Sequence, residues 1–77
     1  MNKERRKALE AVHEKITDAQ EELESLRDEE QEYADNMPES LQSSEKHDTA
    51  ENAVSSMDDA INSLEEATSS IDEANQS

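Results

Sequence analysis

The C-terminal third of the chain repeats every seven residues, and this repeat points to the class of fold. It reads AVSSMDD over residues 53–59, AINSLEE over 60–66, ATSSIDE over 67–73 and ANQS over 74–77. A sustained seven-residue apolar period is typical of helices that pack with left-handed coiled-coil geometry. Because Ser, Asn, Thr and Asp are weak helix formers, this helix, expected over residues 44–75, needs packing against a neighbour. Its apolar row runs through Ala50, Val54, Met57, Ile61, Leu64, Thr68 and Ile71.

The N-terminal half carries a second heptad pattern, in which apolar residues are spaced alternately by three and four. Its a positions are Leu9, Ile16, Leu23, Glu30 and Met37, and its d positions are Val12, Ala19, Leu26 and Tyr33. Glu30 is the single charged member, and Tyr33 is interpreted as a core residue near the end of the helix. No Gly or Pro interrupts the segment, so the pattern predicts a helix over residues 2–36.

A turn over residues 37–43 separates the two patterns. Pro38 lacks a backbone N–H and disfavours the helical conformation of Met37. Ser43 and Ser44 are candidate N-caps of the second helix, and Leu41 is expected to plug the closed end. Since so short a link joins neighbouring antiparallel helices, we expect an all-α fold, a single antiparallel two-helix hairpin over residues 1–77.

A lone hairpin leaves half of each apolar stripe uncovered and buries too little apolar surface to offset the entropy of the chain. We therefore expect two hairpins to form a homodimer, a four-helix bundle. The residues expected to form this oligomer seam are Leu9, Val12, Ile16, Leu23, Leu26, Val54, Met57, Ile61, Leu64 and Ile71.

Composition excludes several classes of protein. The 77 residues include 22 Asp and Glu against 7 Lys and Arg, for a net charge of −15, with no Cys and no Gly. A disulfide framework, a thiolate metal site and a Gly-rich phosphate loop are therefore excluded. Without a basic stripe, direct binding to nucleic acid or an anionic membrane is not expected. No hydrophobic run follows the basic start, so we expect neither a signal peptide nor a transmembrane helix, and a cytoplasmic protein.

Few residues suggest catalysis or metal binding. Glu10 and His13 have the Glu-x-x-His spacing of di-iron bundles, but the heptad register puts them at b and e, which favours a solvated face. His47 is likewise interpreted as a solvated residue at a helix start. No Ser, His and Asp are placed by pattern to form a nucleophile, so we expect no enzyme activity, no cofactor and no metal ion.

The acidic surface is the remaining signal. Acid pairs recur with the heptads, and we expect them to bind a basic surface of a partner protein that itself binds nucleic acid. The leading contacts are Asp58, Asp59, Glu65, Glu66, Asp72 and Glu73. Supporting acids in the first helix are Glu21, Glu22, Glu24, Asp28, Glu29 and Glu32. The alternative is a structural, self-assembling helical-bundle module whose acidic coat is incidental.

The turn DNMPESLQ over residues 35–42, the basic start MNKERRK over 1–7 and the alanine heptads resemble small acidic helical-hairpin proteins of phages and prophages. Those proteins are uncharacterised, so the resemblance carries over no catalytic or ligand residue. It implies a phage accessory protein that acts on a host protein in the host cytoplasm. Together with the acidic surface, it leads us to expect an inhibitor that mimics the charge of nucleic acid.

Overall fold

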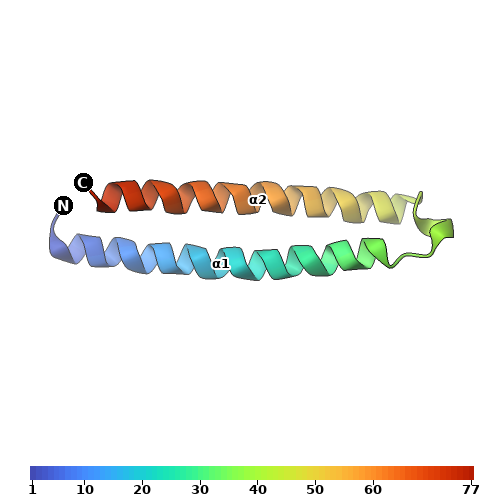
Figure 1. The fold of residues 1–77 in the computed structure, drawn as a ribbon, viewed down its shortest axis with the longest axis horizontal. Helices are drawn as coiled ribbons and strands as arrows, with labels where there is room; N and C mark the ends of the chain where they lie inside the picture. The colour runs from blue at the N-terminus through green and yellow to red at the C-terminus, as the bar shows by residue number, and fades with distance from the viewer.

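The computed structural model describes all 77 residues and contains two long antiparallel helices joined by a short connection (Figure 1). Helix α1 spans Lys3–Asp35, a single 3₁₀ turn η1 spans Glu39–Leu41, and helix α2 spans Glu45–Asn75. The two helices pack against each other along their length, and the chain has no β-strand. The predicted all-α helical hairpin is confirmed.

Capping side chains set the N-terminal ends of both helices. The Asn2 side-chain oxygen accepts a hydrogen bond from the backbone N–H of Arg5 at 2.7 Å. The Ser44 hydroxyl accepts one from the backbone N–H of His47 at 3.3 Å. Each bond satisfies one of the free N–H groups of a first helical turn. The helices therefore begin one residue later than the predicted ranges, because Asn2 and Ser44 are caps.

The closed end of the hairpin is filled by Met37 rather than by Leu41. Met37 is buried together with Ala34 and Ala50, whereas Leu41 is exposed. Leu41 ends the 3₁₀ turn, which a hydrogen bond from the Leu41 N–H to the Pro38 carbonyl at 2.8 Å holds. The expectation that Leu41 plugs this end is wrong, because Leu41 stays 46% exposed while Met37 is 9% exposed and takes that place.

Arg6 fastens the open end, where the two termini lie side by side (Figure 1). Its guanidinium donates to the backbone carbonyls of Asn75 and Ser77, each at 2.8 Å. The last carbonyls of a helix lack partners within the helix and carry partial negative charge, so an arginine stabilises them. Arg6 therefore joins the start of α1 to the end of α2.

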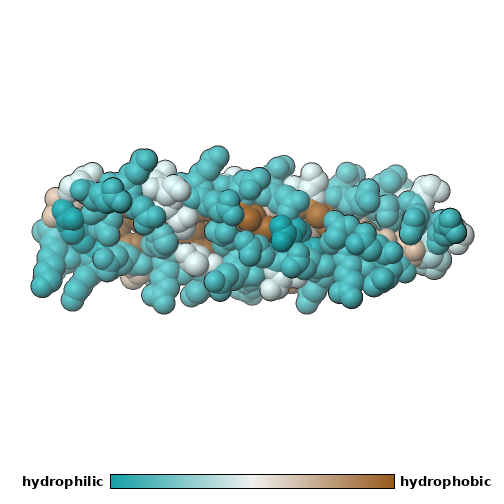
Figure 2. All heavy atoms as spheres, in the orientation of Figure 1, coloured by the Kyte–Doolittle hydropathy of each residue, from teal (hydrophilic) through white to brown (hydrophobic).

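The molecule is a thin rod with a narrow core. Its Cα atoms extend over 60 × 14 × 12 Å, and the radius of gyration is 17.5 Å, against about 12 Å for a compact domain of this length. Only five residues are buried: Ala34, Met37, Ala50, Val54 and Ile61. On the broad face drawn in Figure 2, hydrophilic residues cover most of the surface and hydrophobic ones appear along the junction between the helices. Neither helix holds a segment apolar and long enough to cross a membrane.

Candidate interaction surfaces

Three polar pairs, spaced seven residues apart on each helix, cross between α1 and α2. Arg27 Nη1 donates to Asp58 Oδ1 at 2.9 Å. Gln20 Nε2 donates to Glu65 Oε1 at 3.3 Å, and His13 Nε2 lies 3.3 Å from Asp72 Oδ1. We call these six residues the polar ladder and the broad side of the hairpin that carries them the ladder face. The helices are antiparallel and both rows have the same seven-residue spacing, so each residue of the α1 row meets one acid of the α2 row. The ladder therefore defines how α1 and α2 are aligned.

Arg27 is the most highly connected member of the ladder. Besides Asp58 it contacts Asp28, with 3.1 Å from Nη2 to Oδ1. The hydrogen bond to Asp58, followed by that to Asp28, raises the pKa of the Arg27 guanidinium above its ordinary value. Arg27 therefore stays charged throughout the physiological pH range.

The ladder separates the two acids of each predicted contact pair. Asp58, Glu65 and Asp72 lie against α1. Their sequence neighbours Asp59, Glu66 and Glu73 are exposed and take part in no ion pair. Only the second acid of each pair is fully available to a partner.

Some of the supporting acids of α1 are also bonded to other side chains, and the others are free. Glu24 accepts a hydrogen bond from Gln20 at 3.2 Å, and Asp28 is paired with Arg27. The remaining four are exposed and take part in no ion pair: Glu21, Glu22, Glu29 and Glu32.

The seam of the hairpin includes only one of the two rows predicted for α1. Val54 and Ile61 are buried, and the a positions Leu9, Ile16 and Leu23 are half-buried. The d positions Val12, Leu26 and Tyr33 are exposed, at 42%, 51% and 52%. Half-buried residues complete the seam on α2: Met57, Leu64 and Ile71.

A different row of α1 takes the place of the d positions and alternates with the a positions at the α2 interface. It consists of Arg6, His13, Gln20, Arg27 and Ala34. Tyr33 is therefore not a core residue of the hairpin, and His13 lies at the edge of the seam beside Asp72, with 34% of its side chain exposed. Sequence reasoning missed the ladder, although its signal was present: His13, Gln20 and Arg27 share the period of the three acids that they meet.

Each of the two histidines lies beside a single acid of α2, His13 beside Asp72 and His47 beside Glu51. No three His, Asp or Glu side chains come together in a way that could hold a metal ion. His47 is less exposed than expected, because it lies in the first turn of α2, with Nε2 3.5 Å from Glu51 Oε1.

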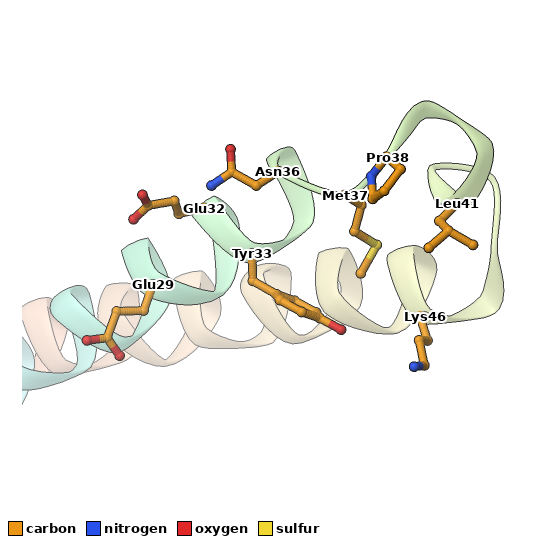
Figure 3. A pocket seen from close by; sticks show the side chains of 8 residues that line it. All are labelled: Glu29, Glu32, Tyr33, Asn36, Met37, Pro38, Leu41 and Lys46. Carbon is orange, nitrogen blue, oxygen red and sulfur yellow. The ribbon is translucent and has the colours of Figure 1, made fainter.

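A cavity of about 530 Å³ opens at the turn (Figure 3). Tyr33 of α1 lies along its wall beside the start of α2, and Met37, Pro38 and Leu41 line the end near the connection. Glu29 and Glu32 place negative charge at its rim. A second cavity of about 380 Å³ lies on the other side of Tyr33. Tyr33 thus belongs both to the exposed apolar row of α1 and to the lining of the two cavities.

Comparison with known protein families, curated proteins and solved structures finds no match to this chain.

Proposed function

We propose that this protein is a non-enzymatic binding protein whose anionic surface docks on a basic surface of a partner protein. The observation that carries the proposal is the lack of free positive charge along the middle of the rod. Residues 16–35 carry nine acids and residues 48–73 carry eight, and the only Lys or Arg among them is Arg27. Arg27 is already paired with Asp28 and Asp58, so it offers little positive charge to the surface.

The charge density of this region supports a partner that binds nucleic acid. The longer segment spans about 39 Å of helix, so the region carries roughly one net negative charge per 2.4 Å, against about one per 1.7 Å of duplex DNA. The free acids Asp59, Glu66 and Glu73 recur about every 10.5 Å along one line of α2. Such a rod attracts a basic groove at long range and gains from the release of the groove's counterions. The specific form of the proposal is a phage-type inhibitor that occupies the nucleic-acid site of a host protein in the host cytoplasm.

Salt-dependent capture from a host lysate, with duplex DNA as competitor, tests the proposal. The immobilised wild-type protein should capture a nucleic-acid-binding protein at about 50 mM salt and lose most of it by about 200 mM. Added duplex DNA should release the same protein. The variant with Asp59→Lys, Glu66→Lys and Glu73→Lys should lose capture while its helix content stays unchanged.

A charge-matched control separates a defined surface from net charge alone. Glu4→Lys, Glu10→Lys and Glu39→Lys change exposed acids near the ends of the rod by the same total charge. This control should keep most of the capture. If the Asp59, Glu66 and Glu73 variant captures as much as the wild type, the proposal is wrong, and the acidic coat is incidental to a structural module.

A further inference from the structure

The side of the hairpin opposite the ladder carries an exposed apolar surface. On α1 it comprises Val12, Ala19, Leu26 and Tyr33, all exposed, and on α2 the alanines that open the heptads, of which Ala60 is exposed and the other three are half-buried. Successive residues of an α-helix are rotated by about 100°, so Ala60 points about 200° away from the ladder acid Asp58. Leu26 in turn lies on the side of the α1 seam away from Asp58. We call this side the apolar face, formed by Val12, Ala19, Leu26, Tyr33, Ala53, Ala60, Ala67 and Ala74.

We propose that the apolar face binds the same face of a second copy, with the two α1 helices antiparallel, to form a four-helix dimer. In a two-fold interface each residue meets the partner's counterpart reciprocally. This arrangement sets Val12 against the partner copy's residue 33 and Ala19 against the partner copy's residue 26. Each large side chain therefore faces a smaller one, as interdigitated packing requires.

The alignment of the hairpin lets one two-fold axis serve both helices. The middle of the α1 row lies between Ala19 and Leu26, and the middle of the alanine row lies between Ala60 and Ala67. These midpoints lie across from each other, because Gln20 contacts Glu65 and Arg27 contacts Asp58. The same axis that pairs the α1 rows therefore also pairs Ala60 with the partner copy's residue 67.

Charge favours a second copy in this orientation. Residues 3–15 carry five Lys or Arg and three acids, whereas residues 16–35 carry nine acids and one Arg. An antiparallel pairing sets the basic part of each α1 beside the acidic part of the other, and a parallel pairing sets like charges together. Lys15 then faces Glu29 of the other copy, and the two copies of Glu22 approach each other near the axis.

The α2 side of the apolar face permits close approach without burying charge. Beyond the alanines lies an exposed row of small uncharged residues: Thr49, Ser56, Ser63 and Ser70. The acids of the α2 heptads lie in the ladder or on the outer surface instead. A second α2 therefore meets only Ala, Ser and Thr along this row.

The size of the apolar face suits a stable dimer. Its rows are about 30 Å long, and two packed helices are about 20 Å wide, so each copy offers about 600 Å². The dimer would bury about 1,200 Å² in total, above the roughly 1,000 Å² that specific interfaces need. The start of the other copy's α1 would also cover the cavity beside Tyr33, whose lining includes Glu29, Glu32 and Lys46 (Figure 3).

Sedimentation equilibrium of the wild-type chain tests the proposal. We expect twice the 8.7 kDa chain mass. Leu26→Asp should raise the dimer Kd about a hundredfold or more, because it places a charge in the interface. The matched control Ser25→Asp adds the same charge at the neighbouring exposed position and should remain dimeric. A fully helical wild-type monomer, or a Leu26→Asp dimer as tight as the wild type, would overturn the proposal.

Two further variants keep the test decisive where Leu26→Asp fails to fold. Lys15→Glu should raise the dimer Kd about tenfold, and adding Glu29→Lys should restore it. Glu22→Gln should lower the Kd, because it removes a like-charge contact at the axis. If the second substitution fails to restore the Kd, or if Glu22→Gln raises it, the antiparallel pairing is wrong.

Orientation is tested by disulfide formation, since the chain has no native cysteine. A mixture of Val12→Cys and Tyr33→Cys chains should form the mixed disulfide dimer under mild oxidation. Tyr33→Cys alone should not, because antiparallel pairing keeps the two copies of position 33 far apart. Efficient crosslinking of Tyr33→Cys with itself would establish a parallel dimer and overturn the proposal.

Discussion

Replacement of Ile61 by alanine probes the burial that holds the hairpin together. Ile61 is 4% exposed and is the largest of the well-buried side chains on α2. Its truncation removes three carbon groups at about 0.8 kcal/mol each, or about 2.4 kcal/mol of transfer free energy. The Cα atoms of the rod extend over only 14 × 12 Å in cross-section, so the neighbours of Ile61 can close around the gap, and the cavity term stays small. We expect a loss of about 2.5–3 kcal/mol.

The assay is thermal and urea unfolding followed by circular dichroism at a fixed protein concentration. A loss of this size lowers Tm by about 10–20 °C in a chain of this length. The control is Asn62→Ala at the neighbouring exposed position, which should raise stability by a few tenths of a kcal/mol, because alanine is the better helix former. If Ile61→Ala changes stability by less than about 0.5 kcal/mol, the seam through Ile61 does not hold the helices together.

Three more changes test the contacts that set the ends and the alignment of the hairpin. Ser44→Ala removes the N-cap of α2 and should cost about 1 kcal/mol in urea unfolding; an unchanged midpoint would contradict the capping role. Arg6→Met keeps most of the side-chain stem but loses both carbonyl contacts, so hydrogen exchange should quicken over residues 70–77 and stay constant near the turn. Arg27→Met should lower Tm at low salt and less at high salt. Because a raised arginine pKa contributes stability at every pH below the unfolded value, this Tm difference should stay constant from pH 5 to about 10, and a difference that varies in that range would refute the assignment.

The helices and their connection follow from local sequence signals. Heptad spacing and the absence of Gly and Pro predict both helices, and Pro38 and Ser44 mark where the connection begins and ends. These signals act over a few residues, so a single sequence carries them completely.

Local sequence signals do not predict which face of α1 packs against α2. The row through Leu9, Ile16 and Leu23 has an apolar neighbour row on one side, through Val12 and Leu26, and a polar one on the other. Apolar periodicity favours the first, but the hairpin uses the second, because His13, Gln20 and Arg27 there each meet an acid of α2. Only the pairing of two distant segments reveals that preference.

The sequence shows which acids the candidate surface contains, but it does not show which of them are free and which contact α1. The heptad acids lie on α2 as expected, but the first acid of each pair contacts α1 as part of the polar ladder. The apolar face results from the same arrangement. Because the polar row of α1 packs against α2, Val12, Leu26 and Tyr33 stay exposed in a single hairpin.

Nuclear Overhauser contacts in the isotope-labelled wild-type chain would show directly whether the polar ladder aligns the two helices. We expect contacts from the Arg27 side chain to Asp58, from the Gln20 amide to Glu65 and from the His13 ring to Asp72. Contacts displaced by one heptad, such as Arg27 to Glu65 and Gln20 to Asp72, or contacts from Leu26 to the buried side of Ile61 in place of the ladder, would contradict it.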